Sequence, residues 1–206
     1  MIAIVDYGIG NLASITNALN KLKVNSIITN DPDEIRNAAA LILPGVGAAG
    51  EGMKNLKKKN LDQLLMNEIN RGKPLLGICL GMQLLFEKSE EGDVECLGVI
   101  KGKVIKFKKE RKVPQIGWNQ IRIQQFNNET MKQLFLDIPN KSYFYFVNSY
   151  YCEQDDKSII AAETIYGEKF PSVIIQKNIV ATQFHPEKSG KVGYRLLENI
   201  IRSFIC

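Results

Sequence analysis

The chain has 206 residues, of which 45% are hydrophobic and 24% charged, and its formal net charge is +5. This length and balance are typical of a globular α/β protein and argue against disorder, collagen and coiled coils. No apolar run reaches the roughly 18 residues of a membrane span. The first eight residues contain no basic stretch and include Asp6, which is unlike a signal peptide. We therefore expect a cytoplasmic protein with one domain, residues 1–206.

The basic surplus consists mostly of lysines, which cluster at 57–59 and 101–112. No aromatic platform accompanies them, so a solvated surface is favoured over nucleic-acid binding. The cysteines at positions 79, 96, 152 and 206 form no CxxC pair, and the chain has a single histidine. This composition predicts free, reduced thiols and gives no indication of a metal site, a disulfide framework or a cofactor.

In the first half of the chain, short apolar runs alternate with segments of helical spacing. We expect strands at 2–6, 26–30, 39–44 and 74–79, and helices over 11–23, from 32, over 52–71 and over 80–89. Apolar strands separated by helices predict a mainly parallel sheet that is covered on both faces.

After residue 96 the strand-like segments follow one another with only short turns between them. They are 99–107, 119–126, 141–151, 159–167, 171–178 and 179–186. This half is expected to be more antiparallel, and an amphipathic helix over 191–205 closes the chain. Because no linker separates the halves, we predict an α/β fold with a single mixed, mainly parallel central sheet flanked by helices.

The first turn fits the pattern G-x-G-x-x-A through Gly8, Gly10 and Ala13, and Asp31 ends the next expected strand. A strand before this turn and a helix after it are the context of a dinucleotide fingerprint. Small residues are also what any tight connection between a strand and a helix needs, and the chain lacks a second nucleotide-binding half. A dinucleotide-binding protein remains an alternative, which predicts binding of NAD(H).

The strongest local signal is the pattern G-x-C-x-G formed by Gly77, Cys79 and Gly81, after an apolar strand and before a helix. This is the nucleophile-elbow pattern with cysteine in place of serine. A thiol at a helix N-terminus is favoured as the thiolate by the helix dipole and the free N–H groups. The alternative is an inert buried cysteine between two packing glycines.

The only histidine, His185, lies two residues before Glu187 on a segment that follows an apolar strand. In an extended segment both side chains project to the same side. Glu187 would then orient the imidazole while its other nitrogen faces Cys79, as a cysteine nucleophile requires. The N–H groups of Leu80 and of the Gly-rich turn 44–47 are candidate oxyanion donors. A structural histidine and a plain turn are the alternatives.

The segments PGVG at 44–47, GICLGMQLL at 77–85 and QFHPEKSG at 183–190 resemble class I glutamine amidotransferases with a Cys-His-Glu triad. Additional segments narrow the resemblance to the glutaminase subunits that serve imidazole glycerol phosphate synthesis in histidine biosynthesis. These are DYGIGN at 6–11, PQIGWN at 114–119, FYFVNSYY at 144–151 and GYRLLENI at 193–200. The resemblance spans nearly the whole chain and implies one type 1 glutamine amidotransferase domain with a flavodoxin-like fold.

The resemblance implies that Cys79 attacks the side-chain amide of L-glutamine, releasing ammonia and forming a thioester that water converts to glutamate. His185 moves the protons and Glu187 orients it. The oxyanion donors implied are at Val46, Gly47 and Leu80. Glutamine-binding positions implied by the family are Gln83, Glu91, Ser149 and Tyr150.

The resemblance also implies a heterodimer with a cyclase subunit of (β/α)8-barrel fold. Ammonia would pass to it through a shielded tunnel and join a ribonucleotide, giving imidazole glycerol phosphate and an aminoimidazole carboxamide ribonucleotide. The interface positions implied are Asn11, Trp118, Tyr145 and Lys188. No nucleic-acid or membrane partner is implied.

The chain departs from the family pattern at Gln115 and Asn148, where the family has histidine. These changes leave open a related alternative in which the partner uses ammonia to amidinate a sugar in surface-glycan biosynthesis. We also expect low activity of the chain alone, with the Gly-flanked peptide at Val46 as the gate, because that peptide has to turn to present its N–H.

Overall fold

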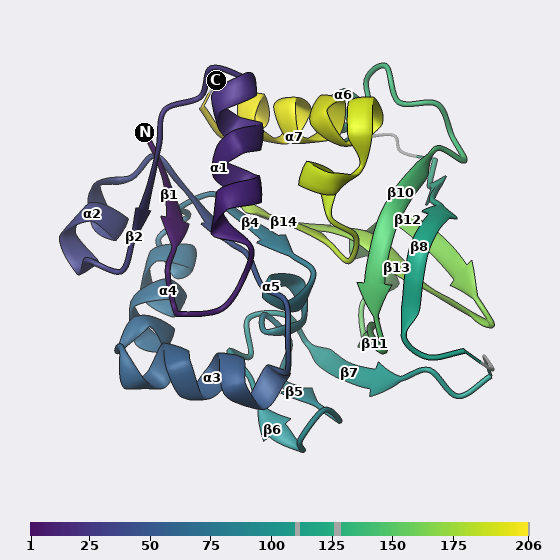
Figure 1. Cartoon of the computed structure of the whole chain (residues 1–206), viewed down its shortest axis with the longest axis horizontal. Helices are drawn as coiled ribbons and strands as arrows, with labels where there is room; N and C mark the ends of the chain where they lie inside the picture. Colours follow the sequence, from purple (N-terminus) through teal and green to yellow (C-terminus); the bar gives the residue numbers. More distant parts are fainter. Residues whose placement is uncertain (110–111, 126–128, 206) are drawn as a thin grey trace.

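A computed structural model describes residues 1–109, 112–125 and 129–205 of the chain (Figure 1). Its centre is an eight-stranded sheet in the order β2-β1-β3-β4-β14-β13-β12-β9. The first five strands are parallel, and the last three are antiparallel to their neighbours. The bounds in that order are Ser26–Thr29, Ile2–Val5, Ala40–Leu43, Leu75–Ile78, Ile179–Thr182, Glu168–Gln176, Ile160–Tyr166 and Arg122–Ile123. The predicted mixed, mainly parallel sheet is confirmed, and its parallel part has the flavodoxin-like strand order.

Helices cover both faces of this sheet because its strands are apolar on both sides. Ile2 and Ile4 of β1 belong to one hydrophobic core, under α1 (Leu12–Lys21) and α7 (Gly190–Ile205). The alternate residues Ala3 and Val5 belong to the other core. That core lies under α2 (Pro32–Asn37), α3 (Ala49–Lys58) and α4 (Leu61–Asn70).

The expectation of a single sheet is wrong for the second half of the chain. β10 (Tyr143–Asn148) pairs with β8 (Gln115–Gln120) in a separate ribbon. β11 (Tyr150–Gln154) instead joins a small sheet with β7 (Gly102–Lys106), β5 (Lys88–Ser89) and β6 (Val94–Glu95). The expected strand 141–151 therefore divides at Ser149, where no glycine or proline marks a break.

The expected strand 119–126 is also interrupted. Ile121 separates the end of β8 from β9, and Phe126 lies outside the described residues. The short elements α6 (Glu129–Leu134) and η1 (Lys157–Ile159) connect strands in this half.

Two predicted helices are shorter than expected. The helix expected over 52–71 is two helices, α3 and α4, because Asn60 adopts a left-handed conformation with φ 55°. Asparagine tolerates this conformation, and the apolar spacing on either side remains helical. The helix expected over 80–89 ends early, since α5 spans only Leu80–Gln83. The closing helix begins at Gly190, one residue before its predicted start.

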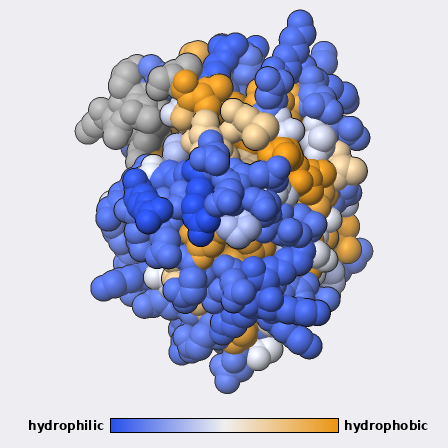
Figure 2. Space-filling view, turned by 90° about the vertical axis from the view of Figure 1, so that its left-hand side faces the viewer, coloured by the Kyte–Doolittle hydropathy of each residue, from blue (hydrophilic) through white to orange (hydrophobic). Residues whose placement is uncertain are grey.

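The molecular surface differs from one side to another. The side that carries α2 and the edge strand β2 is mostly hydrophilic, with small apolar areas (Figure 2). The ribbon of β8 and β10, in contrast, exposes the large apolar side chains of Ile116, Trp118 and Tyr143. Within the described residues, no helix has both the length and the apolar character needed to cross a membrane.

Candidate active site

Cys79 stands at a sharp turn between β4 and α5. Its backbone has φ 53° and ψ −106°, and its N–H donates to Thr182 O at 2.7 Å. The neighbouring glycines let the turn close. A Cβ at Gly81 would lie 1.8 Å from Leu43 O, and one at Gly77 would lie 3.1 Å from Gly81 O. The predicted elbow is therefore present, and its strained cysteine is held between β3 and β14.

His185 and Glu187 lie in the segment after β14, where η2 spans Pro186–Lys188. His185 Nδ1 is 2.8 Å from Glu187 Oε1, and both side chains are buried. Burial alone would lower the pKa of His185, but the Cys79 sulfur and the Glu187 carboxylate outweigh it and raise that pKa to about 10. His185 Nε2 makes no hydrogen bond within the described residues. Glu187 thus orients an imidazole whose second nitrogen remains available to Cys79.

The histidine segment is fastened to the outer ribbon. His185 N–H donates to Tyr145 O at 3.0 Å, and Ser189 Oγ donates to His185 O at 2.6 Å. Tyr145 N–H in turn donates to Ser189 Oγ at 2.9 Å. The position of His185 therefore depends on β10, the strand that carries Tyr145.

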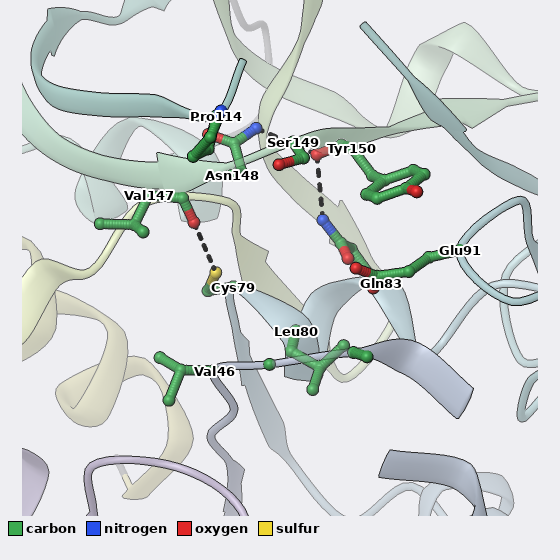
Figure 3. A pocket seen from close by; sticks show the side chains of 12 residues that line it. Val46, Cys79, Leu80, Gln83, Glu91, Pro114, Val147, Asn148, Ser149 and Tyr150 are labelled. Atoms are coloured by element: carbon green, nitrogen blue, oxygen red, sulfur yellow. Dashed lines mark hydrogen bonds between the residues drawn. The ribbon is translucent and has the colours of Figure 1, made fainter. Parts of the chain in front are cut away.

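A cavity opens beside Cys79, between the elbow, the turn at 46–48 and the residues that join β10 to β11 (Figure 3). It brings together all the residues predicted for oxyanion stabilisation and substrate binding. These are Val46, Gly47, Leu80, Gln83, Glu91, Ser149 and Tyr150.

One end of the cavity is rich in hydrogen-bond acceptors. The side chains of Gln83 and Glu91 both line it (Figure 3). Gln83 Nε2 donates to Tyr150 O at 3.1 Å and to Gln183 Oε1 at 3.0 Å, while Glu91 Oε2 accepts from Ala49 N–H at 2.9 Å. Both amide protons of Gln83 are therefore used, so its oxygen and the Glu91 carboxylate are the groups left for a ligand. Such a pair suits an ammonium group.

The turn at Val46 does not present its N–H to the elbow. Leu80 N–H donates to Gly45 O at 3.4 Å. Because the N–H and C=O of a trans peptide point in opposite directions, the N–H of Val46 points away from Leu80. The turn is anchored one residue earlier, where the buried Tyr7 hydroxyl donates to Pro44 O at 2.6 Å. The observed peptide orientation is the one that the expected gate requires in the inactive state.

The two departures from the family pattern face each other in the ribbon, since Gln115 pairs with Asn148. Asn148 Nδ2 donates to Tyr150 O at 3.0 Å. An imidazole N–H is also a donor, so a histidine can serve the same carbonyl. The buried oxygens Gln115 Oε1 and Asn148 Oδ1 have no hydrogen-bond partner within the described residues.

Gln183 is a polar neighbour of Cys79 that the sequence analysis missed. It is fully buried, and its Nε2 donates to Cys79 Sγ at 3.7 Å. The signal was present in the alternation already used for His185 and Glu187. Position 183 is two residues before 185, so its side chain falls on the same side of an extended segment.

The predicted interface residues lie on neighbouring elements. Trp118 and Tyr145 are opposite each other in the ribbon, with ring centroids 6.1 Å apart. Lys188 is exposed in η2, which packs against both β10 and α1. Asn11 is exposed at the start of α1, where its side chain accepts from Ser14 N–H.

The glycines of the dinucleotide pattern have a structural explanation. Gly8 and Gly10 both have positive φ angles, 83° and 117°. A Cβ at Gly10 would lie 3.6 Å from the backbone of Gly45, so this turn packs against the turn before Val46. The tight turn and its neighbour account for both glycines without a nucleotide.

The comparisons with known proteins identify the family of the chain. The family model described as glutamine amidotransferase class-I matches residues 3–203. A solved structure of a glutamine amidotransferase has a TM-score of 0.77 and 17% identity to this chain, with 99% of both chains covered. Another glutamine amidotransferase structure, from Thermotoga maritima, has a TM-score of 0.74 and 16% identity over 100% of this chain and 98% of its own. The chain belongs to the class-I glutamine amidotransferase family.

Within that family, two curated relatives that are similar over nearly the whole chain are subunits of the same enzyme. Imidazole glycerol phosphate synthase subunit HisH 1 of Methanococcus maripaludis is 49% identical, with 98% of each chain covered. Imidazole glycerol phosphate synthase subunit HisH of Dehalococcoides mccartyi is 46% identical, with 98% of this chain and 97% of its own covered. The resemblance read from the sequence motifs is thereby confirmed at the level of the HisH subunits.

Proposed function

We propose that this chain is the glutaminase subunit of an imidazole glycerol phosphate synthase and acts in histidine biosynthesis. The observation that carries the proposal is the buried arrangement of Cys79, His185 and Glu187 beside a cavity with an acceptor-rich end. Its similarity to HisH subunits over nearly the whole chain supports the same function.

In the proposed reaction, the Cys79 thiolate attacks the side-chain amide carbon of glutamine. His185 gives a proton to the leaving nitrogen, so that ammonia departs and a thioester remains. His185 then takes a proton from water, which attacks the thioester and releases glutamate. Gln83 and Glu91 hold the substrate ammonium during both steps, together with the chain at Ser149 and Tyr150.

The proposed partner is a cyclase subunit of (β/α)8-barrel fold that receives the ammonia. The exposed apolar face of the ribbon, with Ile116, Trp118 and Tyr143, suits burial against another protein. Tyr145 and Lys188 border the same region, and Tyr145 O fixes the backbone of His185. Docking at this face would therefore act directly on the segment that carries the histidine.

The proposed gate is the Gly45–Val46 peptide. Its carbonyl accepts the hydrogen bond from Leu80 N–H. Turning this peptide would free Leu80 N–H as one oxyanion donor and supply Val46 N–H as a second. Hydrolysis without the partner would waste glutamine. We therefore expect low glutamate release from the chain alone and strong stimulation by the partner with its ligand.

The sugar-amidinating alternative rested on Gln115 and Asn148. Because Asn148 supplies a donor to Tyr150 O, as an imidazole can, this departure does not call for a different acceptor. Histidine biosynthesis is the function that the HisH relatives favour.

The test is glutamate release from glutamine by this chain, alone and with the histidine-pathway cyclase subunit of the same genome plus its ribonucleotide ligand. We expect stimulation by the complete mixture and loss of release in Cys79→Ala. The cyclase is first shown to be active with free ammonia. If it is active and still does not stimulate glutamate release, the acceptor is a different molecule and the histidine-pathway proposal fails.

A further inference from the structure

Four polar groups form a continuous chain from the cavity wall to the nucleophile. Tyr150 O accepts from Gln83 Nε2 at 3.1 Å, and Gln83 Nε2 also donates to Gln183 Oε1 at 3.0 Å. Gln183 Nε2 then donates to Cys79 Sγ at 3.7 Å. Gln83 and Gln183 are both buried, so neither amide can replace these partners with bulk water.

The far end of this chain fixes its direction. A backbone carbonyl can only accept, so Gln83 must present its NH₂ group to Tyr150 O. The second proton of that NH₂ group then points to Gln183, so Gln183 must accept this hydrogen bond with its side-chain oxygen. As a result, the NH₂ group of Gln183, rather than its carbonyl, faces Cys79. Asn148 Nδ2 donates to the same carbonyl at 3.0 Å, which fills its second lone pair.

We infer that Gln183 is a further catalytic residue, a fixed hydrogen-bond donor that stabilises the Cys79 thiolate, and that Gln83 holds it in this orientation. The inference deepens the proposed glutaminase function, because the thiolate is the form that attacks the amide. It also gives Gln83 a second role, since the same side chain borders the substrate cavity.

The donor opposes another contact of the thiol. Val147 O lies 3.7 Å from Cys79 Sγ and accepts from it when the sulfur carries its proton, which favours the thiol form. A donor to sulfur favours the charged form instead. The titratable groups that act on Cys79 are His185 after β14, Tyr7 after β1 and Cys152 on β11. All three stay unchanged in the variants below.

The test measures alkylation of Cys79 by iodoacetamide as a function of pH, followed by peptide mass spectrometry on the full chain. Gln183→Met keeps the length of the side chain but removes the donor. Hydrogen bonds to charged groups are strong enough that we expect alkylation at pH 7 to fall about tenfold. The partly buried Cys96 in the same digest is the internal control, and its slow alkylation should not change.

The orientation is tested separately with Gln83→Met. Without the Gln83 donor, the Gln183 amide is free to turn. In a chain that keeps Gln183, the substitution should therefore lower the alkylation of Cys79. In the Gln183→Met background the same substitution should have no effect. An equal fall in both backgrounds would overturn the role of Gln83.

Circular dichroism and thermal unfolding verify that each variant is folded. If folded Gln183→Met alkylates like the parent chain, Gln183 does not stabilise the thiolate and the inference is overturned. Should Gln183→Met not fold, Gln183→Leu takes its place, because its apolar side chain cannot donate to the sulfur in any protonation state. Unchanged alkylation in that variant would be equally decisive. The assay needs neither glutamine nor a partner, so it can fail or succeed independently of the proposed function.

Discussion

The elbow that carries Cys79 and the turn that carries Val46 border the same cavity, but they are held in different ways. The elbow lies between two buried strands, and Gly81 touches the backbone of Leu43 so closely that a Cβ has no room. The turn is half-exposed at Val46, and a Cβ at Gly47 would have a single neighbour, at 4.0 Å. The proposed nucleophile is thus built into the core, whereas the proposed oxyanion donor stands on a turn with few packing contacts. Regulation by a partner is expected at the turn.

The largest effect should come from closing the space at the elbow. Gly81→Ala places a Cβ against Leu43 O and should destabilise the fold by more than about 4 kcal/mol or prevent folding. Gly50→Ala is the matched control, because nothing lies within 4 Å of its Cβ position. It should be neutral or stabilising by up to about 1 kcal/mol. Urea unfolding of both variants measures the difference, and equal stabilities would refute the rigid elbow.

The turn should respond in activity rather than in stability. Val46→Pro removes the N–H that the gate is expected to present, and glutamate release in the complex should fall about 10²–10³-fold. Alkylation of Cys79 should stay unchanged, because the elbow is not altered. Val46→Ala keeps the N–H and serves as the control with near-normal release. If Val46→Pro remained fully active, another group would have to supply the oxyanion donor.

The sequence predicted most of the elbow side of the site. Gly77 and Gly81 were singled out because a sharp turn needs residues without Cβ, and the structure gives each an identifiable close contact. His185 and Glu187 followed from the alternation of an extended segment. Gln183 obeys the same alternation and was missed, because no reactive group drew attention to it.

Other features depend on tertiary structure and could not be predicted from local patterns. The break at Ser149 sends two adjoining apolar strands into different sheets, and neither strand differs in pattern from its neighbour. The split between α3 and α4 depends on one left-handed residue, Asn60, inside a continuous helical spacing. The direction of the Gly45–Val46 peptide was expected only as a requirement of the gate, because glycine by itself permits either orientation.

A smaller effect is expected at the His185–Glu187 pair. In Glu187→Gln the imidazolium loses a charged partner, which should lower the free energy of unfolding by about 2 kcal/mol at pH 6. The pKa of His185 is raised from its ordinary value of 6.5 to about 10 in the folded chain. This stabilisation is therefore complete below pH 6.5 and is lost as the pH rises toward 10. Denaturant titrations across that range should show the two chains converging, and a constant or growing difference would contradict the assignment.

The smallest effect should come from the anchor of the turn. Tyr7→Phe removes the hydroxyl that donates to Pro44 O and should cost about 1 kcal/mol of stability. Because this bond holds the residue before the gate, its loss should also let the Gly45–Val46 peptide turn more easily without a partner. Glutamate release by the chain alone should then rise several-fold, while release by the complex changes little.

Tyr143→Phe, on the exposed face of the ribbon, removes a hydroxyl far from this turn and is the control for the partner-free assay. If the ratio of release with the partner to release without it were the same in Tyr7→Phe as in the parent chain, the turn would be held by other contacts. The difference between the elbow and the turn would then need another physical cause.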